Sequence, residues 1–467
     1  MTPPTSAPVR PLSRAAGDGR PAAPVRILHL GLGSFFRAHQ AWYTDRAADA
    51  DQWGTAAFSG RRPDLARALT AQDGLYTLVT RGPEGDRHEL LGALTAAHPG
   101  SDHEAWLQYW RRPELAVVTL TVTEAGYTRR AGAGGGLDTA NADAAADIAA
   151  LRADPEAPVV TAAARLLAGL VARRGAGGGP VAIVSCDNLP GNGAVVRQVV
   201  RELAEAVGQP EFVEAAERAS YVTTMVDRIT PAATDADVAG TAAATGRADA
   251  APVVTEPFSE WVLCGDFPAG RPRWQDAGAR FVADVTPYEE RKLWLLNGAH
   301  SLLAYTGPIL GHDTVAEAVA DPRCRDWLTQ WWTEASAHLS LDQQELTAYQ
   351  QALLERFANP RLRHTLAQIA ADGSQKLPVR ILPALRAERA HGVVPPGATR
   401  ALAAWLLHLR GIGAPVQDPA AAVLSAAATG QPGEAARRVL GFLDPQLAED
   451  VDLVAAVTAR AEEMASL

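Results

Sequence analysis

The sequence changes character near Pro287, and this change limits the folds that the chain can adopt. Before it, short β-favouring runs such as Val25–Leu30 and Leu115–Val122 are separated by helical patterns. After it, segments rich in Ala and Leu repeat at helical spacing: 313–340, 342–357, 361–371, 379–390, 396–410 and 447–466. Strands alternating with helices predict a parallel sheet, and 467 residues favour two domains. We therefore expect an α/β domain at 25–286, a mostly α-helical domain at 287–467, and a ligand cleft between them.

Charge and cysteine content exclude several classes of protein. The chain has 43 Lys and Arg against 53 Asp and Glu, a formal net charge of −10, whereas nucleic-acid binding needs a basic surface. Cys186, Cys264 and Cys324 lie far apart with no CxxC pair, which is not the pattern of a disulfide framework or a cysteine-rich zinc site. We expect a cytoplasmic protein without a metal or a nucleic-acid partner.

The first 24 residues are rich in Pro and Ala and contain three arginines. They lack the continuous apolar core of a secretory signal, so residues 1–24 are predicted to be a disordered arm. Elsewhere no run of about 18 apolar residues suggests a membrane span.

A glycine turn follows the first predicted strand directly, in the sequence Gly31-Leu-Gly33. In dinucleotide-binding folds the first glycine permits the turn and the second lets the backbone approach a pyrophosphate. A lone G-x-G also occurs in ordinary strand-to-helix turns. The position of the usual third glycine is held by Phe36. The candidate cofactor-binding residues at this turn are Gly31, Gly33, Ser34 and Phe35.

The end of the second predicted strand, 54–59, bears on the choice between NAD and NADP. An acidic residue there binds the ribose 2′-hydroxyl of NAD, whereas an arginine accommodates the 2′-phosphate of NADP. Arg61 and Arg62 follow this strand, and an arginine here would allow NADP or dual use. The alternative is that Asp64 takes the acidic role and both arginines are solvated.

Polar residues interrupt the apolar pattern of 289–301, a stretch with helical spacing and no proline. At 100° per residue, Lys292, His300 and Asn297 fall within about 140° on one wall of the helix, among leucines. Burying polar groups on an apolar face is costly unless they are paired, so three together suggest a lined cleft. The alternative is a core helix whose polar groups are satisfied locally.

Two further polar residues stand at the ends of predicted strands. Asn188 follows the strand 180–185, and Asp227 follows Tyr221–Val226. Ligand crevices of open α/β sheets lie at such carboxyl ends. The alternatives are that Asn188 forms a turn and that Asp227 pairs with Arg228 in a structural ion pair.

These stretches, with Thr255-Glu-Pro-Phe258 and Asp372-Gly-Ser-Gln-Lys-Leu-Pro378, resemble the long-chain polyol dehydrogenases, the family of mannitol 2-dehydrogenase and fructuronate reductase. The resemblance runs in order from about Ile27 to the C-terminal region. It implies a Rossmann-type dinucleotide-binding domain, NAD or NADP as cofactor, and a small sugar, polyol or sugar-acid substrate. We expect a monomer or a small homo-oligomer.

The resemblance also implies roles for individual residues. Lys292 would be the catalytic acid/base, Asn188 and Asn297 would form the oxyanion hole, His300 would position the substrate and Asp227 would border that histidine. The residues themselves suggest the same chemistry, because the chain has no Cys/His zinc cluster and Lys292 is the remaining candidate base. A neighbourhood of Leu and Trp is expected to lower its pKa from about 10.4. Glu289 is a candidate proton relay, or alternatively a surface charge.

Substrate choice is predicted from Lys376 and Arg380, two cations four residues apart. Arg380 could hold a carboxylate with both arms of its guanidinium group. The Gln-Lys-Leu-Pro-x-Arg form resembles the fructuronate reductase branch, so D-fructuronate and D-mannonate are the favoured pair. D-fructose and D-mannitol are the alternative, in which case Arg380 pairs with an acid such as Asp372 or Glu388. A remote alternative is a regulator that binds nucleotide without turnover.

Overall fold

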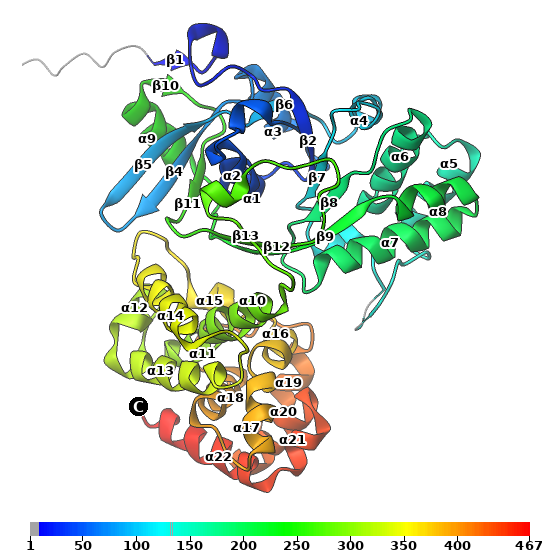
Figure 1. Ribbon diagram of the computed structural model, residues 1–467. Helices are drawn as coiled ribbons and strands as arrows, with labels where there is room; N and C mark the ends of the chain where they lie inside the picture. Colours follow the sequence, from blue (N-terminus) through cyan, green and yellow to red (C-terminus); the bar gives the residue numbers. More distant parts are fainter. Residues whose placement is uncertain (1–8, 131, 133) are drawn as a thin grey trace, which may run out of the picture. The chain divides into compact units, whose positions relative to one another are not determined.

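The computed structural model describes residues 9–130, 132 and 134–467. The chain divides into two units, Met1–Thr286 and Pro287–Leu467, which we call the N-terminal and C-terminal units (Figure 1). In the described ranges, every helix is too short or too polar to cross a membrane.

The N-terminal unit is built on a mostly parallel sheet. Among the described residues it has eight strands, in the order β13-β12-β9-β8-β7-β2-β3-β6. These are β2 Val25–Leu30, β3 Gly54–Phe58, β6 Leu94–His98, β7 Val117–Leu120, β8 Ala182–Ser185, β9 Ser220–Asp227, β12 Glu260–Cys264 and β13 Arg280–Phe281. All neighbours from β6 to β9 are parallel, and β12 runs antiparallel to β9. In chain order the parallel strands follow the 3-2-1-4-5-6 arrangement of the Rossmann fold, so the predicted fold class is confirmed.

Both faces of this sheet are buried, which explains the continuous apolar runs of its strands. Leu28 and Val118 pack into one core, with α6 Ala162–Gly175 and α7 Asn192–Val207. Ile27 and Val117, their neighbours in sequence, pack into a second core with Trp261. Successive side chains of a strand point to opposite faces, so each strand contributes to both cores.

A smaller sheet joins distant parts of the N-terminal unit. β4 Tyr76–Gly82 and β5 Gly85–Leu91 form an antiparallel hairpin, and β11 Val253–Thr255 pairs in parallel with β4. The sequence pattern did not predict the hairpin.

The expectation of a disordered arm at 1–24 is wrong for residues 9–24, and residues 1–8 lie outside the described residues. β1 Arg10–Pro11 pairs in parallel with β10 Arg247–Ala248. The carboxylate of Asp18 is fully buried and accepts hydrogen bonds from Arg10 at 2.5 and 2.6 Å and from Arg247 at 2.7 Å. Composition favoured disorder, but this ion-pair cluster and the burial of Leu12 hold the segment against the domain.

The C-terminal unit consists of helices. These are α10 Thr286–Arg291, α11 Ala299–Thr306, α12 Val315–Ala320, α13 Pro322–Ser336, α14 Gln343–Phe357, α15 Leu366–Ala370, α16 Gly373–Arg380, α17 Leu382–Ala390, α18 Pro396–Leu409, α19 Ala421–Ala427, α20 Pro432–Leu443, α21 Pro445–Glu449 and α22 Val451–Ala465. Every residue of α18 from Gly397 to Leu409 is buried, as expected for a helix that is apolar on all sides. The single helix predicted at 313–340 is wrong, because Asp321 caps a new helix that begins at Pro322.

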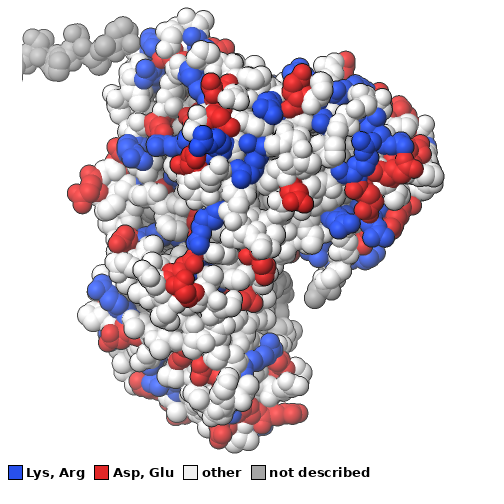
Figure 2. Space-filling view, in the orientation of Figure 1, with Lys and Arg blue, Asp and Glu red and all other residues white. Residues whose placement is uncertain are grey.

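Charged groups of both signs are mixed on the surface. Figure 2 shows basic and acidic side chains interspersed over the visible face. Several form exposed ion pairs, such as Arg46 with Glu89 and Arg111 with Glu156. Each such pair contributes little to stability, because water and salt screen it.

Candidate active site

The glycine turn after β2 has the geometry that its sequence predicts. Gly31 has φ 110°, and a Cβ there would lie 2.0 Å from the carbonyl oxygen of Thr121, so the position requires glycine. Gly33 precedes α1 Ser34–Ala38, and a Cβ on it would meet only the oxygen of Gly31 within 4 Å. The backbone at Gly33 is therefore open to close approach.

Phe36 replaces the usual third glycine by packing inward. Its ring stacks on His29, with centroids 3.6 Å apart and an interplanar angle of 11°. The His29 ring is hydrogen-bonded to Thr119 and Thr121, and burial lowers the pKa of His29 to about 3. Phe36 thus changes the packing beneath the turn and leaves the turn itself intact.

A cavity of about 1000 Å³ opens at the carboxyl ends of the strands. The cavity is lined after each of these strands and around the start of α6. The lining residues include Gly31 and Leu32 after β2, residues 59–61 after β3, residues 100, 101 and 103 after β6, residues 121–123, 125, 126 and 128 after β7, and residues 158–162 and 165 around the start of α6. Strand order reverses between β2 and β7, and such switch points are where open α/β sheets bind dinucleotides. Position, size and the glycine turn all fit a dinucleotide.

The predicted cofactor residues are not equally placed around this cavity. Gly31 and Arg61 line it, whereas Gly33, Ser34, Phe35 and Arg62 are not among its lining residues. Asp64 begins α3 Asp64–Ala71 with a side chain 80% exposed, and its ion pair is with Arg67 at 3.9 Å. Arg61 and Asp64 are both exposed after β3, so the choice between NAD and NADP stays a prediction.

Asp187, which precedes Asn188, organises one wall of the cavity. Its carboxylate accepts hydrogen bonds from the backbone N–H groups of Val122 and Thr123, at 3.1 and 2.7 Å, and from the Tyr127 hydroxyl. Thr123 has φ 67°, a strained value for a β-branched residue. Burial raises the pKa values of both Asp187 and Tyr127. The sequence pattern did not identify this network, although Asp187 directly precedes the candidate residue Asn188. Asn188 itself is exposed at the end of the strand.

Asp227 is the last residue of β9, and Arg228 follows it. Arg228 donates to the carbonyl oxygens of Ala38 and Glu256 and lies 4.7 Å from the centroid of the Trp42 ring. Among the described residues, it forms no ion pair with Asp227. Asp227 is 4% exposed, at the end of the strand where the sequence placed it.

Residues 286–306 form one continuous helix whose middle is a π-helix, Lys292–Gly298, which we call the π segment. The expected spacing of 100° per residue is therefore wrong in this stretch. Bonds from i to i+5 widen the turn to about 4.4 residues, which brings Lys292 and Asn297 about 50° apart instead of about 140°. Both side chains are half-buried. The wider turn improves the predicted grouping of these two residues.

Two tryptophans of α13 hold the π segment. The indole N–H groups of Trp331 and Trp332 donate to the carbonyl oxygens of Trp294 and Leu295, at 2.9 and 2.8 Å. A Cβ on Gly298 would lie 2.7 Å from the Trp331 ring. Close packing and two indole hydrogen bonds thus stabilise a turn that would otherwise be uncommon.

His300 and Glu289 flank the π segment. His300 is 8% exposed, and its ring lies 4.9 Å from those of Phe357 and His364. Glu289 stands on α10, three residues before Lys292, and is half-buried.

Arg380 is the predicted cation that meets the π segment. Its Nη1 donates to the Ser301 hydroxyl at 3.2 Å and approaches the Asn297 carbonyl oxygen at 3.5 Å. Within the described residues it has no carboxylate partner: Glu388 binds His338, and Asp372 lies near Lys376. Burial lowers the pKa of Arg380 to about 10, so it stays charged at neutral pH.

Lys376 is engaged differently. Its ammonium donates to the carbonyl oxygens of Ala371 and Ile369, at 2.6 and 3.2 Å, and lies 3.9 Å from Asp372. Most of the N–H donors of the Lys376 ammonium group are therefore used by residues close to it in sequence.

Arg165 also lines the cavity, and the sequence pattern did not identify it. The available signal was a lone charge in an apolar run, Thr161-Ala-Ala-Ala-Arg-Leu-Leu167.

Comparison with known proteins gives consistent matches along the chain. The family model "Mannitol dehydrogenase Rossmann domain" matches residues 25–276, and "Mannitol dehydrogenase C-terminal domain" matches residues 284–465. D-mannonate oxidoreductase of Escherichia coli (strain K12) is 37% identical over 459 residues, covering 94% of this chain and 93% of that protein.

Two solved structures are similar over most of the chain. D-sorbitol dehydrogenase in substrate-free form has a TM-score of 0.84 at 27% identity, covering 98% of this chain and 96% of that one. Pseudomonas fluorescens mannitol 2-dehydrogenase, in a ternary complex with NAD and D-mannitol, has a TM-score of 0.77 at 30% identity, covering 98% and 94%.

Proposed function

Because the chain belongs to the mannitol dehydrogenase family, we propose that it interconverts a keto-sugar acid and its aldonate, with D-fructuronate and D-mannonate as the favoured pair. It is an NAD(P)-dependent oxidoreductase acting on CH–OH groups. The similarity to D-mannonate oxidoreductase extends over nearly the whole chain and supports this substrate class.

The observation that supports the proposal is that the guanidinium group of Arg380 has no carboxylate partner among the described residues. Its guanidinium group lies against the π segment beside Asn297 and Ser301, without a carboxylate partner among the described residues. A sugar acid would supply that carboxylate, in charge-assisted hydrogen bonds that a neutral polyol cannot match. Lys376 is held by backbone carbonyls, so Arg380 is the cation we assign to the substrate carboxylate.

The proposed mechanism uses the roles that the family resemblance implies for residues of the π segment and of the strand ends. Lys292 takes the hydroxyl proton during oxidation and returns it during reduction. The side-chain amides of Asn297 and Asn188 donate hydrogen bonds to the developing oxyanion. The nicotinamide, when bound, exchanges the hydride with the substrate carbon. His300 holds a substrate hydroxyl and Glu289 relays the proton to solvent, and Asp227 keeps the role that the family resemblance implies.

The cavity at the strand ends is proposed to hold the adenosine half of the cofactor. Arg61 in its wall supports NADP or dual use. We also propose a cytoplasmic location, because the three cysteines lie far apart in the sequence and do not form a disulfide pattern. The proposed state is a monomer or a small homo-oligomer.

A second candidate is a mannitol 2-dehydrogenase acting on D-fructose and D-mannitol. The structural similarity to the Pseudomonas fluorescens enzyme favours it, at 30% identity over 98% of this chain. In that case Arg380 would support the π segment and would not meet the substrate.

Replacing Arg380 distinguishes the two candidates. Arg380→Gln should raise KM for D-fructuronate about 10–100-fold, the value of a hydrogen bond to a charged group, with a much smaller change for D-fructose. Ser301→Ala is the matched control, because it removes a partner of Arg380 and keeps the cation. Equal losses with both substrates would reject the carboxylate role.

A further inference from the structure

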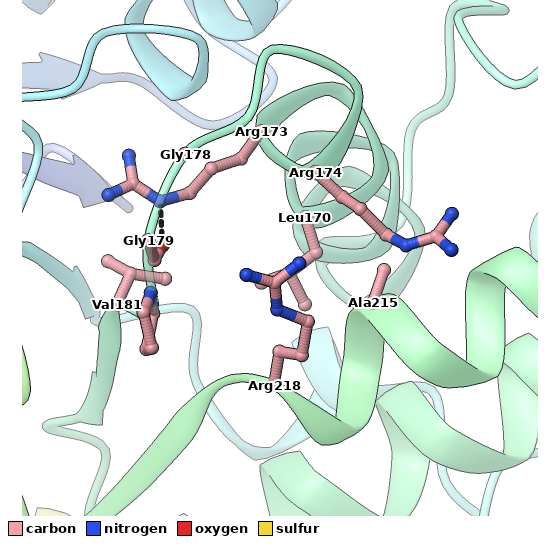
Figure 3. Close-up of a pocket in the computed structure, with 9 residues that line it drawn as sticks. Leu170, Arg173, Arg174, Gly178, Gly179, Val181, Ala215 and Arg218 are labelled. Atoms are coloured by element: carbon pink, nitrogen blue, oxygen red, sulfur yellow. Dashed lines mark hydrogen bonds between the residues drawn. The ribbon is translucent and has the colours of Figure 1, made fainter.

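α6 buries two arginines whose guanidinium groups have opposite environments. Arg173 is saturated: it donates to the carbonyl oxygens of Gly179, Trp110, Arg112 and Leu115 at 2.6 to 3.3 Å. Figure 3 shows it reaching back to Gly179 beside a hollow of about 10 Å³. A buried cation of this kind has a structural role, since backbone oxygens occupy its donors.

Arg165, two turns earlier on the same helix, lacks such acceptors. The residue is 5% exposed, and its Nε and Nη2 are buried with no hydrogen-bond partner among the described residues. Its guanidinium carbon lies 4.8 Å from the Trp106 ring centroid and 5.5 Å from that of Phe58. Aromatic faces attract the cation, but they do not satisfy its N–H groups.

The carboxylate whose charge acts on Arg165 is already engaged. Asp102 caps α4 His103–Trp110 through the N–H of Ala105 and is hydrogen-bonded to the ring of His98. Burial lowers the pKa of Arg165 to about 10, so the side chain remains a cation at neutral pH. A buried cation without an acceptor is strongly destabilising, which makes this site incomplete as it stands.

The cavity around Arg165 indicates what completes the site. Phe58 is the last residue of β3, and the residues after it, Ser59 to Arg61, line the same cavity as Arg165. The end of this strand is where Rossmann folds read the 2′ position of the adenosine ribose. Asp143 is the single carboxylate among the described lining residues, against the cations Arg61 and Arg165.

We propose that Arg165, with Arg61, forms the subsite for the 2′-phosphate of NADP(H), which makes Arg165 a determinant of cofactor choice. The assignment rests on the dinucleotide-binding role proposed for the cavity. Arg165 supplies a buried cation that lies beside the rings of Phe58 and Trp106, and Arg61 supplies an exposed cation after the end of β3. The phosphate oxygens would accept hydrogen bonds from the guanidinium group of Arg165 where it lines the cavity.

The test compares 2′,5′-ADP with 5′-AMP, which lacks only the 2′-phosphate, by calorimetry on the full-length protein without cofactor. The wild type should bind 2′,5′-ADP more tightly. Arg165→Met should weaken the binding of 2′,5′-ADP about 10–100-fold and change the affinity for 5′-AMP by no more than about twofold. Arg174→Met is the control: this arginine lies on the same helix, is exposed and pairs with Glu214, so its loss should alter neither ligand.

Each other outcome rejects the assignment in a distinct way. Equal affinity of the wild type for the two ligands would exclude a 2′-phosphate subsite and leave the dinucleotide role intact. If Arg165→Met weakened the binding of both nucleotides equally, Arg165 would contact the part that the two nucleotides share and not the 2′-phosphate. Failure to bind either ligand would reject the dinucleotide role as well. Thermal unfolding without ligand supplies a further check: Arg165→Met should keep or raise Tm, whereas a structural arginine like Arg173 would lower it on removal.

Discussion

Lys292 is the first residue of the π segment and the proposed acid/base. Lys292→Ala should lower kcat by about 10²–10⁴-fold, since it removes general acid–base catalysis. Nucleotide affinity, measured by calorimetry, should stay unchanged, because the cavity after β2 and β3 does not include this residue. Near-normal rates across the pH range would show that the proton is handled elsewhere.

Asp18 gives a prediction about the folded N-terminal segment. Hydrogen bonds from Arg10, then from Ser13 and Arg247, hold the pKa of Asp18 well below its usual range. A lowered pKa stabilises the fold above the unfolded-state pKa of about 4, and this contribution is lost as the pH falls below it. Asp18→Asn should therefore lower Tm at neutral pH, and the difference from wild type should shrink below about pH 4.

The control for this pH dependence is Asp64→Asn, because Asp64 is an exposed carboxylate with a distant ion pair. It should leave Tm almost unchanged at every pH. A constant difference between Asp18→Asn and wild type down to low pH would contradict the role of the Asp18 charge.

At the scale of elements, the π segment depends on the small size of Gly298. A methyl group there would press on the Trp331 ring, which is itself hydrogen-bonded to Trp294. Gly298→Ala should lower stability by about 1–3 kcal/mol, as overpacking does, and should also lower kcat by moving Asn297. Chemical unfolding and steady-state rates measure the two effects.

Gly240→Ala is the matched control for this substitution. Gly240 lies in α9 Asp235–Thr245, where a Cβ would meet nothing within 4 Å. Alanine there should stabilise by up to about 1 kcal/mol through helix propensity, without an effect on kcat. If both substitutions had the same effect, the close contact at Gly298 would not be decisive.

The sequence predicted the presence of helices and strands better than their local geometry. The apolar spacing of 289–301 indicated a buried helix, but the π turn depends on Trp331 and Trp332, which are distant in sequence. The break at Asp321–Pro322 was a readable local signal that the apolar pattern of 313–340 obscured. Local patterns identify an element, whereas tertiary contacts decide its exact geometry.

For the whole molecule, the order of strands and helices predicted the Rossmann-type unit and the helical unit that follows. The ordered segment 9–24 was not predictable from composition, because Asp18 is held by Arg247, far away in the chain. The role of Arg165 was not predictable for a similar reason, because its neighbours Phe58 and Trp106 are distant in sequence. The catalytic roles of Lys292, Asn188, Asn297 and His300 stay predictions based on the family resemblance.

The most direct measurement is the initial rate of reduced nicotinamide oxidation with D-fructuronate, D-tagaturonate and D-fructose in parallel, each with NADH and with NADPH. The sugar-acid proposal predicts turnover with an uronate and little with D-fructose. Turnover with D-fructose alone would contradict the role of Arg380, and no turnover with any of these pairs would contradict the proposed substrate class.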